Sequence, residues 1–186
     1  YERFESVIVV EGCREVAELQ YATQTVMALR EHEYLGELVD GKLHYYATAI
    51  TPAMAKPAVG TGSVYAIGAH DSEGNYLDGG KTYTVTLPAP IPAKDFWSFV
   101  VYDNQTRSVL ETDQKSAGVD SNSPDIKANA DGSYTVWFAP TPPAGKEGNW
   151  VQTMPGKGYN VLLRLYGPLE PWFDKTWMPG DFELVE

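Results

Sequence analysis

An apolar run at residues 96–102 stands out from the mixed sequence around it, and it stops at the turn signal Asp103-Asn104. Its β-branched and aromatic residues favour a strand over a helix. Successive strand residues face opposite sides, so one side carries Trp97, Phe99 and Val101. The other side carries Phe96, Val100 and Tyr102. Both sides are apolar and need cover, which predicts a strand in the middle of a β-sandwich.

The chain after residue 62 repeats one pattern, in which short alternating segments are separated by Gly, Pro, Asn and Asp. Residues 82–87 are the clearest case, because large apolar residues alternate there with threonines. Further strands are predicted at residues 63–69, 108–112, 134–139 and 159–166. Residues 113–133 are polar and are predicted to form a long loop. Strands at intervals of about ten residues, with turns between them, indicate a β-sandwich or barrel.

The first part of the chain follows a different pattern. After a β-like run at residues 7–10, residues 11–38 place apolar side chains at helical spacing between charged ones, which predicts a long amphipathic helix. Such a helix must cover its apolar stripe with the sandwich or with a second copy of the chain, so a homo-oligomer formed through it is one expectation. Pro and Gly residues before position 63 mark a boundary between an N-terminal helical arm (1–62) and a β-sandwich domain (63–186).

Composition and charge narrow the classes of partner. The 186-residue chain has a formal net charge of -11, and an acidic surface repels phosphates, so no nucleic-acid partner is expected. No apolar run reaches the roughly 20 residues of a membrane-spanning helix, so no membrane span is expected either. Cys13 is the single cysteine, which rules out an internal disulfide.

Several motifs occur in a fixed order along the second part of the chain; they lie at residues 71–79, 96–103, 131–133, 149–150, 155–158 and 163–168. This set resembles the bacterial family called domain of unknown function 1214, which is commonly found C-terminal to domain of unknown function 1254. The resemblance implies a jelly-roll-like antiparallel β-sandwich. It also implies a second β domain upstream, often behind a secretory signal, so a periplasmic or secreted location is expected and a cytoplasmic one stays open. The family supplies no catalytic residues.

Two local clusters invite a chemical interpretation, and both are better explained as turns. His70-Asp71-Ser72 holds the residue types of a catalytic triad, but neighbours on a strand point in opposite directions and triads are assembled in space. The acidic residues between Asp71 and Asp78 lack the spacing of a calcium loop, and the three histidines lack the spacing of zinc ligands. No metal site and no cofactor are expected, and catalytic residues stay unassigned.

Arg164 is the most informative polar residue, because it interrupts an apolar strand. Alternation places it on the same face as Leu162 and Tyr166. One interpretation is an internal ion pair with a carboxylate, for which the candidates are Asp103, Glu111 and Asp113. The other is an anchor for an acidic group of a ligand, a role that Arg107 in the turn after residue 103 could share.

Five tryptophans and twelve tyrosines suggest a carbohydrate ligand stacked on aromatic rings as an alternative. Trp97 and Trp137 lie in apolar alternation, which is typical of core residues. Trp150, Trp172 and Trp177 flank loops and are the ones expected at the surface.

Taken together, these patterns favour a ligand-binding or accessory β-sandwich domain of a bacterial envelope or secreted protein, with a small-molecule or carbohydrate ligand. The candidate ligand-binding residues are Arg164, Arg107, Tyr102, Tyr166 and Trp150. Two alternatives stay open: a hydrolase-type enzyme whose site is shared with a missing N-terminal domain, and a purely structural module that self-associates. The sequence leaves open whether the chain is an enzyme.

Overall fold

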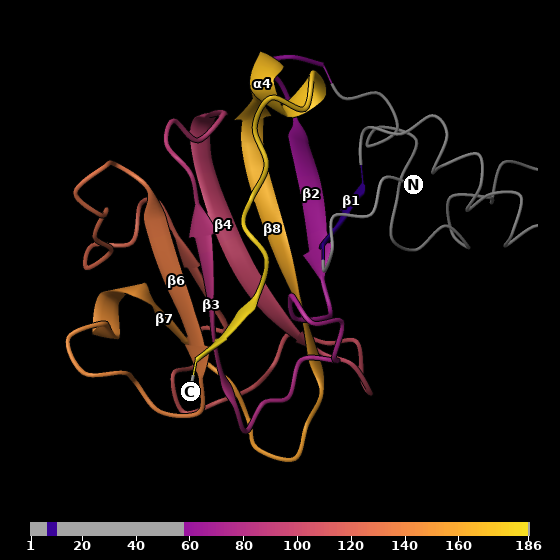
Figure 1. The fold of residues 1–186 in the computed structure, drawn as a ribbon, viewed down its shortest axis with the longest axis vertical. Helices are drawn as coiled ribbons and strands as arrows, with labels where there is room; N and C mark the ends of the chain where they lie inside the picture. Colours follow the sequence, from indigo (N-terminus) through magenta and orange to yellow (C-terminus); the bar gives the residue numbers. More distant parts are fainter. Residues whose placement is uncertain (1–6, 11–57, 186) are drawn as a thin grey trace, which may run out of the picture.

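Strand β4 (Ala93–Asp103) contains the apolar run of the sequence and lies inside a sheet, between β8 (Tyr159–Pro168) and β5 (Gly118–Asp120). The structure is a computed structural model that describes residues 7–10 and 58–185. The pairing of β4 with β8 is antiparallel and runs from Ala93 to Asp103, with a shift in register between Ala93 and Phe96. This long pair forms the middle of the larger sheet (Figure 1).

The larger sheet has five strands in the order β1-β2-β8-β4-β5. Strand β2 (Ser63–Gly68) pairs with β8, and β1 (Val7–Val10) pairs with β2 at the edge, so all the pairs in this sheet are antiparallel. The N-terminal segment assigned to the helical arm therefore contributes a strand to the sandwich. The amphipathic helix predicted at residues 11–38 lies outside the described residues.

The smaller sheet has four strands in the order β7-β6-β3-β9. Their bounds are Thr82–Leu87 for β3, Tyr134–Ala139 for β6, Trp150–Gln152 for β7 and Glu183–Val185 for β9. The pair of β6 with β7 is parallel, so the prediction of a purely antiparallel sandwich is wrong at this edge. The physical reason is the connection: residues 140–149, with a 3-10 turn η2 (Glu147–Asn149), carry the chain back before β7 begins.

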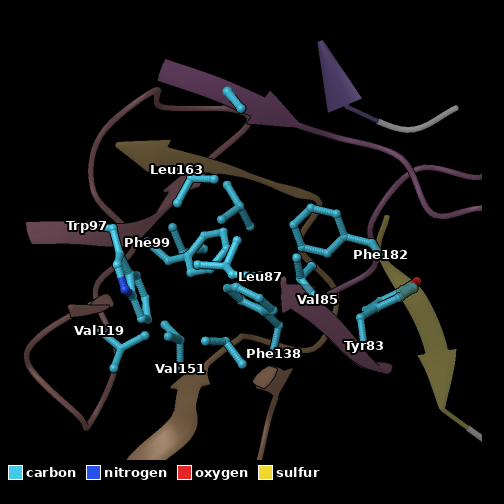
Figure 2. Close-up of a cluster of buried hydrophobic side chains, with 14 of the residues drawn as sticks. Tyr83, Val85, Leu87, Trp97, Phe99, Val119, Phe138, Val151, Leu163 and Phe182 are labelled. Carbon is cyan, nitrogen blue, oxygen red and sulfur yellow. The ribbon is translucent and has the colours of Figure 1, made fainter. Parts of the chain in front are cut away.

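The inner faces of the two sheets form one apolar core (Figure 2). Trp97, Phe99 and Val101 point into it from β4, as the alternation predicts, and each is at most 3% exposed. The ring of Phe99 meets that of Phe138 from the other sheet edge to face, with centroids 5.6 Å apart. A gap of about 10 Å³ beside Phe99 and Phe182 has room for no more than one water.

The outer face of β4 is different from the expectation. Phe96, Val100 and Tyr102 are only half-buried, and among the described residues no second layer covers them. The prediction that both faces of this strand are fully covered is therefore wrong for the described part of the chain. These residues are partly buried by side chains of the neighbouring strands, as the stacking of Phe96 on Tyr166 shows.

The connections also depart from the predicted pattern. Residues 108–112 form a single bridge, between Val109 and Tyr102, instead of a strand. The predicted loop at residues 113–133 contains β5, which is only three residues long and gives little sequence signal. One helical turn, α4 (Glu170–Phe173), follows β8, and the buried Trp177 and Phe182 hold the following segment against the core.

The core predicts a sharp contrast between two valines of the same segment. Val101 is 0% exposed and Val109 is 50% exposed. Because truncation in a packed core loses transfer energy and leaves a cavity, Val101→Ala should lower the free energy of unfolding by about 2 kcal/mol. The matched control Val109→Ala should change it by less than about 0.5 kcal/mol. Urea denaturation measures both, and equal losses would contradict the assigned faces of β4.

Candidate functional site

Arg164 lies in the middle of β8, and its side chain is on the outer face of the larger sheet. The burial of β8 alternates strictly, so that Val161, Leu163 and Leu165 face the core while Arg164 is half-buried on the other side. Tyr65 of β2 and Ser98 of β4 are its direct cross-strand partners. The guanidinium is therefore flanked on both sides by strands that bury the aliphatic part of the side chain.

The partners of Arg164 are tyrosines. One of its terminal nitrogens donates a hydrogen bond of 2.8 Å to the hydroxyl of Tyr102. Its guanidinium carbon lies 5.6 Å from the ring centroid of Tyr65, within the range of a cation–π contact. Its Nε is buried and has no hydrogen-bond partner.

The same environment shifts the pKa of the Arg164 guanidinium. Burial lowers the pKa of the guanidinium, but side-chain hydrogen bonding with Tyr166 and the nearby hydroxyls of Tyr102 and Tyr65 outweigh that effect, and the net pKa is raised. We call these four residues the tyrosine–arginine cluster: Tyr65, Tyr102, Arg164 and Tyr166. It presents one permanent positive charge on an outer face whose cross-strand row also carries Asp120, two strands away.

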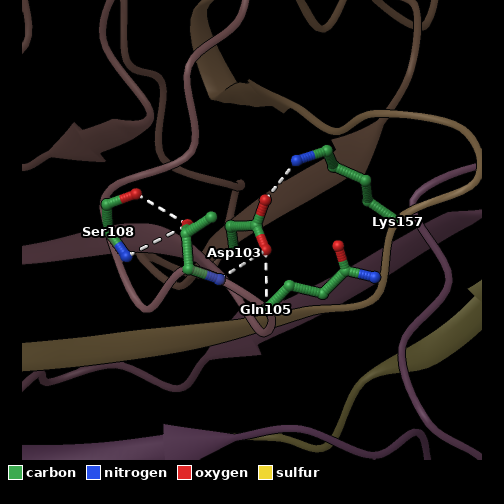
Figure 3. A network of polar contacts seen from close by, with 5 residues as sticks. Asp103, Gln105, Ser108 and Lys157 are labelled. Carbon is green, nitrogen blue, oxygen red and sulfur yellow. Dashed lines mark hydrogen bonds and ion pairs between the residues drawn. The ribbon is translucent and has the colours of Figure 1, made fainter.

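No carboxylate in the described part of the chain forms an ion pair with Arg164. Asp103, one of the partners that the sequence suggested, is 3% exposed and pairs instead with Lys157 (Figure 3). Glu111 and Asp113 are exposed and lie in the segment after the β4 turn. The internal ion pair is thus replaced by a set of hydroxyl partners.

Tyr166 and Phe96 extend the site along the strands. Their rings stack with centroids 4.0 Å apart and an interplanar angle of 12°. The two residues are cross-strand partners one row beyond Arg164, and both are half-buried on the outer face. The structure therefore brings together three of the residues predicted from the sequence, Arg164, Tyr102 and Tyr166, and adds Tyr65 and Phe96.

Two of the predicted residues lie apart from this cluster. Arg107 is exposed in the turn after β4, in the left-handed region at φ 61°, and its backbone N–H donates to the carbonyl of Asp103. Trp150 belongs to the other sheet, where its indole N–H donates to the carbonyl of Ala139 at 2.9 Å. No contact between described residues joins either one to Arg164.

Fewer tryptophans are available to stack on a carbohydrate than the sequence predicted. Trp172 and Trp177, which the sequence placed at the surface, are 3% and 7% exposed and pack near each other, so neither can act as an open platform. Trp150 is half-buried, and its cross-strand partner on β6 is the half-buried Trp137. Stacking of a sugar therefore stays a prediction for this pair alone, on the outer face of the smaller sheet.

The Asp103–Lys157 pair is a polar contact that sequence reasoning missed. Asp103 ends β4 and also accepts hydrogen bonds from the backbone N–H groups of Gln105 and Thr106, at 2.7 and 3.2 Å (Figure 3). Lys157 comes from the turn before β8. The Asp-Asn signal and the Pro-Gly-Lys-Gly turn were both visible, but only the antiparallel pairing of β4 with β8 places these ends together.

The clusters that looked like a triad or a cation loop form turns. Asp71 is 1% exposed and accepts hydrogen bonds from the backbone N–H groups of Glu73 and Asn75, at 3.1 and 2.8 Å. Ser72 donates to Glu183, and His70 stacks on Tyr76. Among residues 7–10 and 58–185, no group of His, Cys, Asp or Glu is arranged to hold a metal ion. The same residues contain no helix with the length and apolarity to span a membrane.

The fold and the outward-facing cluster define a class of protein: a mainly β, two-sheet sandwich with a charged aromatic outer face. The chain belongs to the family described as protein of unknown function, DUF1214, whose model matches residues 62–170. The association with domain of unknown function 1254 remains an expectation from the resemblance.

Similarity to solved structures agrees with the fold. A crystal structure of the VPA0106 protein from Vibrio parahaemolyticus superposes with a TM-score of 0.57 at 24% sequence identity, covering 67% of this chain and 31% of that one. At this level of identity the likeness concerns the fold alone.

Curated relatives of another kind match shorter segments. The chain is 56% identical over 48 residues to a flavodoxin/ferredoxin–NADP reductase from Rhodobacter capsulatus, and 36% identical over 97 residues to ferredoxin–NADP reductase A from Sorangium cellulosum. These matches cover 26% and 51% of this chain. The chain spans only 18% and 30% of the lengths of those two proteins.

The Asp103–Lys157 pair predicts a pH-dependent contribution to stability. Hydrogen bonding to Lys157, and then to the N–H of Gln105, holds the pKa of Asp103 below its usual value of 3.8. A lowered pKa stabilises the fold above the unfolded-state pKa, and this contribution disappears as the pH falls through the folded-state pKa. Asp103→Asn should therefore be less stable than the parent at pH 7, and the difference should shrink below about pH 3.8.

Urea unfolding of both proteins between pH 7 and pH 3 measures this difference. The control is Asp113→Asn, which changes an exposed aspartate and should match the parent across the range. A stability gap for Asp103→Asn that stays constant down to pH 3 would show that the carboxylate's charge is not what stabilises the turn.

Proposed function

We propose that this DUF1214 domain is a ligand-binding module and that its site is the tyrosine–arginine cluster on the outer face of the larger sheet. The observation that carries the proposal is Arg164, a half-buried guanidinium whose partners among the described residues are tyrosines and no carboxylate. A buried or half-buried charge without a counter-ion is costly, and it is relieved when an acidic group arrives. An acidic small molecule is therefore the ligand that the site favours.

Other expectations accompany this proposal. The domain would have the jelly-roll-like strand arrangement of the family resemblance, would begin near residue 63 and would follow an upstream β domain in a periplasmic or secreted bacterial protein. A carbohydrate ligand on the Trp137–Trp150 pair, self-association through the N-terminal segment and a hydrolase site shared with an upstream domain are alternatives. A single cation surrounded by hydroxyl groups supports binding of an acid more directly than any of these.

Replacing Arg164 tests the proposal. In a thermal-shift screen of organic acids on the whole chain, at least one acid should raise Tm by about 3 °C or more near saturation, because binding to the folded state alone stabilises it. The shift should vanish in Arg164→Gln and persist in the matched control Arg107→Gln, which removes an exposed arginine outside the cluster. If Arg164→Gln keeps every shift, this site is not the binding site.

A second candidate function comes from the curated relatives, which are named NADP reductases acting on ferredoxin or flavodoxin. The matched segments are 48 and 97 residues long, and the longer one must overlap the family match, which begins at residue 62. In this case the chain would carry part of an NADP-binding unit alongside the β-sandwich. High identity over a short segment favours a chain that joins part of a reductase to the β-sandwich over a chain that is a complete reductase.

Calorimetric titration with nucleotides tests this second function. If the reductase-like segment is functional, NADP+ should bind the whole chain at least about 10-fold more tightly than NAD+, a difference of about 1.4 kcal/mol. The binding should be the same in Arg164→Gln, because that residue belongs to the sandwich. Absence of heat with NADP+ at millimolar concentration would dismiss the nucleotide function.

A further inference from the structure

We infer that the tyrosine–arginine cluster is specific for a singly charged carboxylate with an apolar body about one ring in length. This inference rests on the proposed function and specifies the chemistry of its ligand. Four features of the face lead to it: the surplus of hydrogen-bond donors, the single positive charge, the apolar surroundings and the spacing between strand rows.

Two of the hydroxyls around Arg164 already accept hydrogen bonds from protein donors. The hydroxyl of Tyr102 accepts from the guanidinium at 2.8 Å, and that of Tyr65 accepts from Ser63 at 2.9 Å. Each of these hydroxyls keeps its own hydrogen for another partner, as a hydroxyl both accepts and donates. The guanidinium has further N–H groups to give, so the cluster is rich in donors and calls for an oxygen acceptor.

The charge of the site selects among oxygen acceptors. Arg164 is the one cation among the outward residues of its cross-strand row, which runs from Tyr65 through Arg164 and Ser98 to Asp120. Asp120 stands two strands away and accepts a hydrogen bond from the backbone of Asn122. Because Asp120 is distant, the charge of the Arg164 guanidinium is left to balance one negative charge on a ligand. Phosphate, sulfate and dicarboxylates would bring a second charge into an acidic protein without compensation.

A carboxylate also fits the shape of the donor. The guanidinium presents parallel N–H groups in a plane, which match the two oxygens of a carboxylate in a bidentate pair. The Nε of Arg164 is buried and has no partner, so we assign the fork to the two terminal nitrogens, of which one also donates to Tyr102. Lysine offers a point charge and would lose this geometry.

The rows on either side of Arg164 are apolar and set the length of the ligand. On one side Leu162 stands between Ile67 and Val100, and on the other Tyr166 stacks on Phe96. Next-but-one residues of a strand are about 6.8 Å apart, and the Arg164–Tyr102 hydrogen bond spans the Leu162 row, so a carboxylate at Arg164 places the ligand body over the Tyr166–Phe96 row. A phenyl ring on a short linker fills such a distance. Aromatic contact with Phe96 would orient it.

The experiment compares four probes on the whole chain by calorimetry: 3-phenylpropionate, its neutral counterpart 3-phenylpropan-1-ol, succinate and inorganic phosphate. We expect 3-phenylpropionate to bind at least about 10-fold more tightly than each of the other three. Arg164→Lys keeps the charge and should weaken binding at least about 10-fold, while Phe96→Leu should weaken it about 3-fold. Arg107→Gln should match the parent. Near-ultraviolet circular dichroism verifies that each variant is folded.

The possible failures are distinguishable. If phosphate or succinate binds more tightly than 3-phenylpropionate and Arg164→Gln abolishes that binding, the monocarboxylate inference is overturned and the acid-binding function stands. If 3-phenylpropan-1-ol binds as well as the acid, or Arg164→Lys binds as well as the parent, the charge and fork arguments are wrong. If no anion binds at all, both the inference and the proposed function fail.

Discussion

Everything in this structure depends on the strict alternation of β8 in the middle of the larger sheet. Val161, Leu163 and Leu165 are at most 2% exposed, and they fill the core between the two sheets. Arg164 stands between two of them and must face the other way. A slip of one residue in the register would move the guanidinium into the core and three aliphatic side chains out of it. The burial that stabilises the sandwich therefore also fixes the position of the charge.

The outer face follows from the same constraint. Because Tyr65, Ser98 and Arg164 are cross-strand partners, the neighbours of the guanidinium are set by the registers of β2 and β4 on β8. The backbone of Tyr102 lies two cross-strand rows from Arg164, opposite Asn160. The two residues form a hydrogen bond because both side chains are long. The hydrogen bond between these two side chains spans the row of Leu162 and Val100, which contributes to the half-burial of that face among the described residues.

Predictions from the sequence were most accurate for features that depend on one strand, such as the face on which a residue lies. Alternation alone identified the apolar face of β3, sorted the residues of β4 onto its two faces and placed Arg164 on the same face as Leu162 and Tyr166. Predictions from the sequence were wrong for features that depend on contact between two segments distant in the chain. Strand β5 is three residues long and forms only because β4 offers it an edge, and β7 is parallel because of the path of residues 140–149. The partners of Arg164 were misjudged for the same reason, since a sequence shows which carboxylates exist but not which hydroxyls are adjacent.

The residues that carry the family likeness divide into two kinds when placed in the structure. Gly79 has no space for a side chain, because an added Cβ would lie 2.1 Å from the carbonyl oxygen of Met154, and Asp103 and Lys157 join the end of β4 to the turn before β8. These positions serve the fold. Arg164 is not explained in that way: an aliphatic residue at an outward, half-buried position of β8 would avoid the cost of desolvating a charge. Among the described residues the partners of Arg164 are tyrosines and no carboxylate, so no ion pair offsets the cost of partly burying this charge.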